Sequence, residues 1–138
     1  MNVIIPGTFD MFHNGHRELI RYGSMIGRVY IVINGDDICA KYGKQCKDNE
    51  LERLKNVNTY LNSKGICAIV ELIKHDTDTI DIAKSISPCF WLTGRDWDLD
   101  STSERNDVPI TFWEENNIYL IYKDRVPNLS STKLRLSK

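Results

Sequence analysis

The sequence predicts an α/β fold of the doubly wound class, in which a parallel sheet of five strands is covered by helices on both faces. Strand-like and helix-like hydrophobic patterns alternate from one end of the chain to the other. Glycines, carboxylates and basic residues also gather where the predicted strands end. Alternating strands and helices favour a parallel sheet, because each crossover helix returns the chain to the same end of the sheet.

The first half of the chain contains three predicted strands and two predicted helices. Leu54, Val57 and Leu61 recur at helical spacing, and Gly27 and Gly65 are placed to end their helices. The strands are short runs rich in Val, Ile and Tyr. The predicted elements are a strand at 2–6, a helix at 14–26, a strand at 28–34, a polar loop at 35–48, a helix that begins after the N-cap Asn49, and a strand at 66–73.

The second half continues the alternation. Pro88 closes one predicted helix, and Gly94 follows the strand after it. The polar segment 101–107 carries no clear periodicity and is expected to form a loop. The predicted elements are a helix at 77–87, strands at 89–93 and 118–122 with a helix at 109–116 between them, and a short final helix at 130–137. No repeat or linker interrupts this order, so residues 1–138 are expected to form one domain with a Rossmann-like architecture.

Composition excludes several classes of function. The chain has 138 residues, 41% of them hydrophobic and 27% charged, with a formal net charge of -1. This balance favours neither nucleic acid nor an anionic membrane as a partner. No apolar run approaches the roughly 20 residues that span a bilayer, and no signal peptide is evident, so a cytoplasmic location is expected. The four cysteines show no C-x-x-C spacing, which predicts reduced thiols and no zinc site.

Ligands of doubly wound sheets bind beyond the carboxyl ends of the strands. Four predicted strand ends carry the residue types that bind phosphate or orient a reacting group. These ends are the stretches 6–8, 34–36, 93–95 and 122–125. Their shared edge of the sheet is therefore the expected site.

The segment that follows the first strand, residues 7–16, carries the strongest chemical pattern. Gly7 allows close approach of the backbone to a bound group, and Gly15 removes a side chain that would crowd a nucleotide. His13 and His16 are three residues apart at the start of a helix, so their side chains can face the same way. The helix dipole favours neutral imidazoles that donate to an anion. The alternative is that one histidine caps the helix and the other is exposed.

The sequence of residues 7–16, GTFDMFHNGH, resembles the signature of the cytidylyltransferase-like nucleotidyltransferases, which contains an H-x-G-H element. The segment Gly94-Arg95-Asp96-Trp97 resembles the family's G-x-D-W stretch, and residues 125–133 resemble its R-x-x-G-[IL]-S-[ST]-T pattern. Three elements in family order cover nearly the whole chain. The terminal pattern departs at Asn128, where the family has glycine, although asparagine also tolerates a left-handed turn.

The resemblance implies a set of site residues. The catalytic set, which stabilises the transition state, is His13, His16, Lys44 and Arg125. The nucleotide-binding set is Gly7, Thr8, Phe9, Asp10, Gly15, Arg53, Gly94, Asp96, Trp97, Ser130, Ser131 and Thr132. Asp36 is implied as an acceptor-binding residue. Lys41 or Lys47 could share the role of Lys44, because the lysine loop aligns loosely with the family. No metal ligands are implied, and Mg²⁺ is expected to arrive on the nucleotide.

The resemblance also implies the activity, which is transfer of a nucleoside monophosphate from an NTP to a small phosphorylated or alcohol acceptor. The motif details are most similar to those of cytidylyltransferases, which favours CTP and a glycerol-3-phosphate-like acceptor. The alternatives are an adenylyltransferase that uses ATP, with a heptose-phosphate-like acceptor, and a nucleotide-binding regulatory module without turnover. A homodimer is expected from the family resemblance alone.

Overall fold

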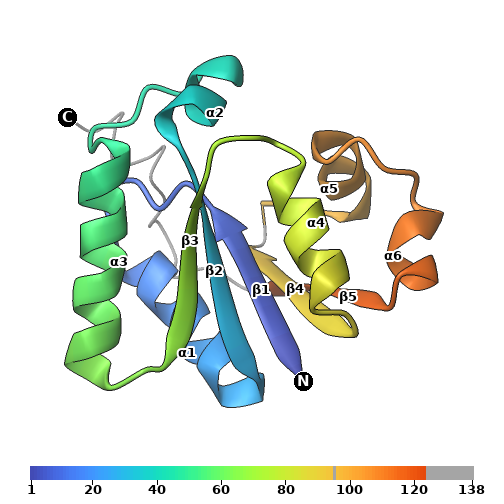
Figure 1. The fold of residues 1–138 in the computed structure, drawn as a ribbon, viewed down its shortest axis with the longest axis horizontal. Helices are drawn as coiled ribbons and strands as arrows, with labels where there is room; N and C mark the ends of the chain where they lie inside the picture. The colour runs from blue at the N-terminus through green and yellow to red at the C-terminus, as the bar shows by residue number, and fades with distance from the viewer. Residues whose placement is uncertain (95, 124–138) are drawn as a thin grey trace.

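The computed structural model describes residues 1–94 and 96–123. Five parallel strands form one sheet in the order β3-β2-β1-β4-β5 (Figure 1). The strands are β1 (Asn2–Gly7), β2 (Arg28–Asn34), β3 (Ala68–Ile73), β4 (Cys89–Gly94) and β5 (Ile118–Lys123). The helices are α1 (Asn14–Ile26), α2 (Asp36–Lys41), α3 (Glu50–Lys64), α4 (Asp78–Ser85), α5 (Leu99–Arg105) and α6 (Thr111–Glu115). The predicted doubly wound α/β class is confirmed.

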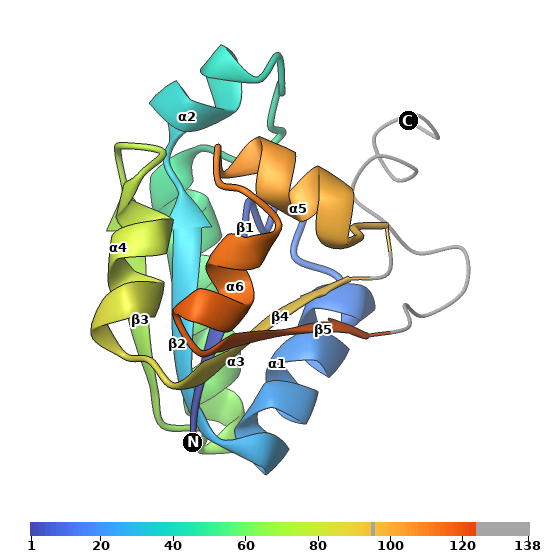
Figure 2. The same cartoon turned by 90° about the vertical axis from the view of Figure 1, so that its right-hand side faces the viewer.

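Two apolar cores fill the spaces on the two faces of the sheet. Helices α1 and α3 pack on one face, where Ile20 and Val57 meet β-strand residues such as Ile31. Helices α4 and α6 cover the other face, where Ala83 and Trp113 pack against β4. Figure 2 shows α1 and α4 on opposite sides of the sheet. Because both faces are covered, the central strands are nearly continuous apolar runs rather than alternating ones.

Two helices form where the sequence predicts loops. Helix α2 begins after Gly35, with Asp36 and Asp37 in its first turn, where carboxylates complement the helix dipole. Helix α5 begins at a capping box in which Asp98 accepts from the Ser101 backbone N–H at 2.8 Å. Both helices are too short to show a clear helical period. Strand β3 begins at 68 rather than 66, and the predicted helix at 130–137 lies outside the described residues.

The strand order places a switch point at β1. The chain runs outward from β1 to β2 and β3 on one side and then crosses to β4 and β5 on the other. A crevice forms at such a reversal, because the connections from the two halves leave the sheet in opposite directions. In Figure 1 β1, β2 and β3 end toward the top of the molecule, and α2 lies at that end. None of the helices in the described part of the chain is long and apolar enough to cross a membrane.

We expect the Ile5→Ala substitution to lower the free energy of unfolding by about 3 kcal/mol, because it removes buried apolar volume and leaves a cavity. Ile5 is fully buried on β1, whereas Ile69 on the edge strand β3 is 46% exposed. The matched control Ile69→Ala should therefore cost less than about 1 kcal/mol. Urea unfolding measures both values. Equal losses for the two variants would contradict the assignment of β1 to the centre of the core.

Candidate functional site

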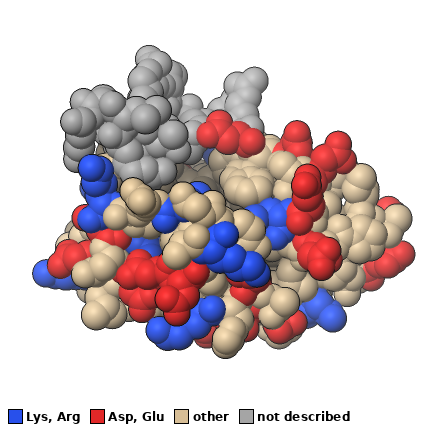
Figure 3. Space-filling model, turned by 90° about the horizontal axis from the view of Figure 1, so that it is seen from above, with Lys and Arg blue, Asp and Glu red and all other residues tan. Residues whose placement is uncertain are grey.

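A cavity of about 410 Å³ opens at the carboxyl ends of the strands. Its walls come from the β1–α1 turn, the first turns of α1, the end of β2, α2 and the loop after it, the end of β4, and α5. Figure 3 views this end of the molecule and shows basic side chains toward its middle with acidic ones on either side of them. The structure brings together most of the sequence-predicted site residues here: Gly7, Thr8, Phe9, Asp10, His13, Gly15, His16, Lys44, Gly94, Asp96 and Trp97.

The β1–α1 turn is held by an aromatic side chain in an unusual backbone conformation. Phe9 and Met11 have left-handed φ values of 58° and 49°, which large side chains rarely adopt. The Phe9 ring is only 3% exposed, and a Cβ added at Gly7 would lie 3.1 Å from it. Gly7 therefore makes room for the Phe9 ring. Burial of that ring fixes the turn whose backbone faces the cavity.

The two histidines form one rigid pair at the start of α1. His13 Nδ1 accepts from the Gly15 backbone N–H at 3.0 Å, and His16 Nδ1 accepts from the His13 backbone N–H at 3.2 Å. The two rings stack with centroids 3.8 Å apart. Because each Nδ1 is an acceptor, each neutral imidazole carries its proton on Nε2. The pair thus caps the helix and at the same time presents two N–H donors, so the alternative of one cap and one exposed histidine is wrong.

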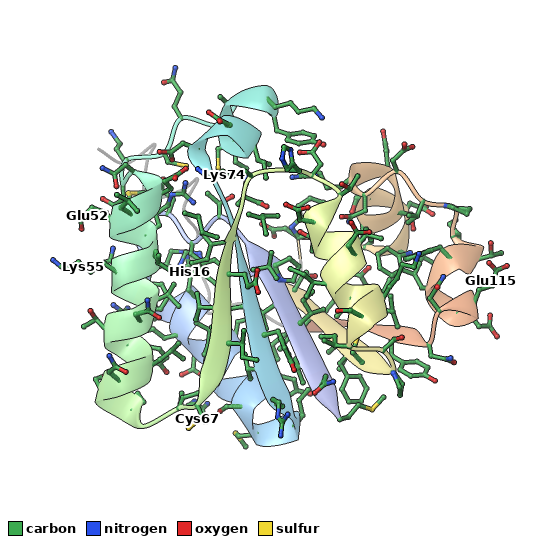
Figure 4. All side chains as sticks on the ribbon, in the orientation of Figure 1. His16, Glu52, Lys55, Cys67, Lys74 and Glu115 are labelled. Carbon is green, nitrogen blue, oxygen red and sulfur yellow. The ribbon has the colours of Figure 1, made fainter. Side chains whose placement is uncertain are left out.

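Aromatic side chains fix the orientation of His16 within the molecule. The Phe12 ring stacks on the imidazole with centroids 5.7 Å apart, and the Phe9 ring lies against it at 5.3 Å. Figure 4 shows His16 between α3 and the sheet, whereas Glu52 and Lys55 lie on the outer side of α3. An imidazole packed in this way loses little further freedom when it binds an anion, which is the property that transition-state stabilisation needs.

The loop that follows α2 is anchored by a buried carboxylate. Asp10 is 1% exposed and accepts from the backbone N–H groups of Lys47 and Asp48 at 3.1 and 3.0 Å. Lys44 lies within the anchored segment, and its Nζ is 3.4 Å from Thr8 Oγ1. Lys41 instead pairs with Asp76. Among the loop lysines that the sequence left open, Lys44 is therefore the one that lines the cavity.

Arg53 does not line the cavity, and its place in the nucleotide-binding set stays a prediction. Its side chain is fully buried, and Nη1 donates to the carbonyls of Thr8 at 2.8 Å and Asn34 at 2.7 Å. Nε donates to the Asp48 carbonyl at 3.2 Å, and Nη2 pairs with Asp36 Oδ1 at 2.7 Å. All of these hydrogen-bond acceptors are oxygen atoms of the protein itself. Its role is to tie together the ends of β1 and β2.

The Asp36 carboxylate is also engaged by protein partners, and its acceptor-binding role stays a prediction. Its carboxylate pairs with Arg53 and accepts from the Glu50 backbone N–H at 3.2 Å, while Glu50 Oε1 accepts from the Asp36 backbone N–H at 2.8 Å. These reciprocal bonds join the N-termini of α2 and α3. Asp36 does not line the cavity. The predicted residues Arg125, Ser130, Ser131 and Thr132 lie outside the described residues, and their roles remain predictions.

The structure adds cavity residues that sequence reasoning missed. Tyr42 and Arg105 line the side formed by α2 and α5, where loops were expected. The signal that could have identified α5 is the capping box at Asp98 and Ser101. On β4, the Trp91 and Thr93 side chains also line the cavity; their Nε1 and Oγ1 atoms are buried without a hydrogen-bond partner in the part of the chain that the structure describes.

The thiols and carboxylates of the described residues do not assemble into a metal site. These residues contain no cluster of three or more His, Cys, Asp or Glu side chains that could hold a metal ion. Burial raises the pKa of the Cys46 thiol to about 11, so it is protonated at neutral pH. Cys67 lies at the end of the molecule opposite the cavity (Figure 4). Delivery of Mg²⁺ by the nucleotide stays a prediction.

The fold is a doubly wound α/β architecture with a cavity at the N-terminus of α1, a position that favours anions in proteins generally. The chain belongs to the cytidylyltransferase-like family, whose family model matches residues 4–137. A phosphopantetheine adenylyltransferase of Malacoplasma penetrans is 30% identical over 135 residues, which are 95% of this chain and 85% of that protein. One of Methanopyrus kandleri is 32% identical over 72 residues, which are 51% of this chain. That match spans only 46% of the Methanopyrus kandleri protein's own length.

Solved structures show the same fold at low sequence identity. An Archaeoglobus fulgidus protein of unknown function superposes with a TM-score of 0.69 at 18% identity, over 94% of each chain. The lipopolysaccharide core biosynthesis protein of Thermoplasma volcanium gives 0.61 at 17% identity, over 91% of this chain and 96% of that one. At these identities the likeness supports the fold alone.

We expect Arg53→Met to lower the free energy of unfolding by about 3 kcal/mol, because three carbonyls lose their donor. Arg21 offers a matched control, since its guanidinium pairs with Glu18 on the exposed surface of α1. The Arg21→Met variant should unfold at nearly the wild-type denaturant concentration. Chemical unfolding of both variants measures the difference, and a wild-type midpoint for Arg53→Met would show that the guanidinium does not hold the strand ends together.

Proposed function

We propose that this protein is a nucleotidyltransferase that transfers AMP from ATP to a small phosphorylated acceptor and releases pyrophosphate. The observation that carries the proposal is the histidine pair, in which both Nδ1 atoms accept backbone N–H groups at 3.0 and 3.2 Å. Two fixed Nε2–H donors beside a helix N-terminus suit the negative charge that develops on an α-phosphate during substitution.

In the proposed reaction a phosphate oxygen of the acceptor attacks the α-phosphorus of ATP. The bond from this phosphorus to the bridging oxygen breaks, and pyrophosphate leaves with the electron pair. His13 and His16 donate to the α-phosphate oxygens, and Lys44, held near Thr8, adds a positive charge. No covalent enzyme intermediate is required, because positioning and charge stabilisation account for catalysis of this kind.

The names of the relatives favour ATP over CTP. The similar proteins of Methanopyrus kandleri, Methanothermobacter thermautotrophicus and Malacoplasma penetrans are all phosphopantetheine adenylyltransferases. These names support the adenylyl alternative better than the sequence-based preference for CTP and a glycerol-3-phosphate-like acceptor. They also support an acceptor that carries a phosphate group, which is common to the adenylyl and the cytidylyl alternatives.

An activity assay with each combination of two nucleotides and three acceptors tests the proposal. The full chain is incubated with ATP or CTP and with 4′-phosphopantetheine, glycerol 3-phosphate or a heptose phosphate, and pyrophosphate release is measured. Turnover with ATP and one of the acceptors supports adenylyl transfer. Turnover with CTP alone would replace it with cytidylyl transfer. Nucleotide binding without pyrophosphate release in any combination would favour a regulatory module.

His16→Ala is expected to lower kcat by about a hundred-fold or more, with little change in the KM for nucleotide, since the lost donor acts mainly on the transition state. The matched control is His75→Ala, because His75 is exposed and does not line the cavity. Steady-state pyrophosphate release measures both variants. Similar kcat values for the His16 and His75 variants would remove His16 from the mechanism.

Activity is expected to require Mg²⁺ that binds to the nucleotide. The cavity's Asp10 carboxylate is already engaged by two backbone N–H groups, and Mg²⁺ prefers substrate phosphates and water with few protein ligands. Excess chelator should therefore abolish pyrophosphate release, and added Mg²⁺ should restore it in proportion to the MgATP formed. Full activity in chelator would be inconsistent with this requirement.

A further inference from the structure

The cavity reaches the face of the sheet that lies opposite α1. The histidine pair belongs to α1, whose residue Ile20 packs in the core between α1, α3 and the sheet. Ile38 and Trp91 also line the cavity, but they belong to the core on the other face of the sheet. The part of the cavity on that side has its walls on α2, β4 and α5. We name it the α2–α5 arm.

Arg105 is held at the α2–α5 arm by an aromatic ring. It is the last residue of α5, and its Cζ lies 3.7 Å from the centroid of the Tyr42 ring, which follows α2. Both side chains line the cavity. Stacking of a guanidinium on an aromatic face leaves the N–H groups at its edge available for a planar or tetrahedral anion. Tyr42 therefore restricts the guanidinium without occupying its donors.

The carboxylate nearest to Arg105 is already hydrogen-bonded to other side chains. Asp76 is the nearby carboxylate, but it accepts from Lys41 and from the Tyr42 hydroxyl, the latter at 2.9 Å. The hydrogen bond from Lys41 lowers the pKa of Asp76, so the two form an ionised pair at neutral pH. Within residues 1–94 and 96–123, no carboxylate lies within ion-pair distance of Arg105. One positive charge therefore remains at this side of the cavity.

Two buried polar atoms on β4 point to the same kind of ligand. Trp91 is 2% exposed and Thr93 is 7% exposed, and their Nε1 and Oγ1 atoms have no hydrogen-bond partner in the described residues. Indole Nε1 can only donate, so its missing partner is an acceptor oxygen or nitrogen. Buried donors left without a partner are costly, which favours a ligand rich in oxygen in this arm.

We propose that Arg105, oriented by Tyr42, binds the phosphate of the acceptor substrate in the α2–α5 arm. The proposal rests on the proposed function for the identity of the ligand as the acceptor. The nucleotide's α-phosphate has its own donors at the N-terminus of α1, in the histidine pair and Lys44. Arg105 lies on another element, α5, at the α2–α5 arm. It therefore acts as a specificity-determining residue that selects phosphorylated acceptors.

Binding of defined phosphates tests this role without turnover. Isothermal titration of the full chain, with a non-hydrolysable ATP analogue present, measures the Kd of inorganic phosphate, glycerol 3-phosphate and 4′-phosphopantetheine. Arg105→Ala should weaken the tightest of these probes by about tenfold or more, as expected for a lost charge-assisted hydrogen bond. Arg105→Lys should recover part of the lost affinity, because lysine keeps the positive charge but lacks the planar set of N–H donors of arginine. Tyr42→Leu should give a smaller loss than Arg105→Ala.

Controls separate this role from a structural one. The exposed Arg28 at the other end of the sheet gives the matched variant Arg28→Ala, which should bind all probes as wild type does. All variants should keep the wild-type Tm and the wild-type Kd for the ATP analogue. The proposal is overturned if no probe binds the wild-type chain, if Arg105→Ala binds them unchanged, or if that variant loses the nucleotide analogue instead. Arg105-dependent phosphate binding without pyrophosphate release would refute the proposed function and leave the anion site standing.

Discussion

The geometry of the site depends on one buried cation. The Arg53 guanidinium joins the carbonyl of Thr8 in the β1–α1 turn, the carbonyl of Asn34 at the end of β2, and the Asp48 carbonyl at the start of α3. A guanidinium has five donors in a fixed fork, so it can hold several carbonyls at defined positions where a lysine could not. Its burial is tolerated because Asp36 balances the charge and protein oxygens replace water. The ends of β1 and β2 are thereby held at fixed positions relative to each other.

The histidine pair also acts through hydrogen bonds to the backbone. In most helices the first N–H groups are capped by Ser, Thr, Asp or Asn. Here His13 and His16 provide the cap, and the capping bonds themselves select the tautomer that donates from Nε2. Helix initiation and the proposed anion recognition therefore depend on the same two side chains. Replacing either imidazole with a conventional capping residue would preserve the helix and lose the donor.

The sequence was sufficient for the fold class and for most of the cavity. Period-2 and continuous apolar runs identify buried strands well, and the Gly7–His16 segment is contiguous, so its residues reach the site together. The roles of Arg53 and Asp36 could not be predicted, because their partners are backbone groups on other elements, up to 45 residues away in the chain. Helices α2 and α5 have six and seven residues and are too short for a detectable period. Tyr42 and Arg105 were missed with them.

The position of the cavity at the strand reversal has a chemical consequence. Substitution at phosphorus requires the attacking and leaving oxygens to lie on opposite sides of the α-phosphate. Helix α1 packs on one face of the sheet, and the α2–α5 arm extends toward the other. For the proposed transfer, this arrangement offers one approach from each face of the sheet, with the β1–α1 turn that Phe9 and Arg53 hold between them. A sheet that wound in one direction only would carry all its connections on one face and could not bring two ligands together in this way.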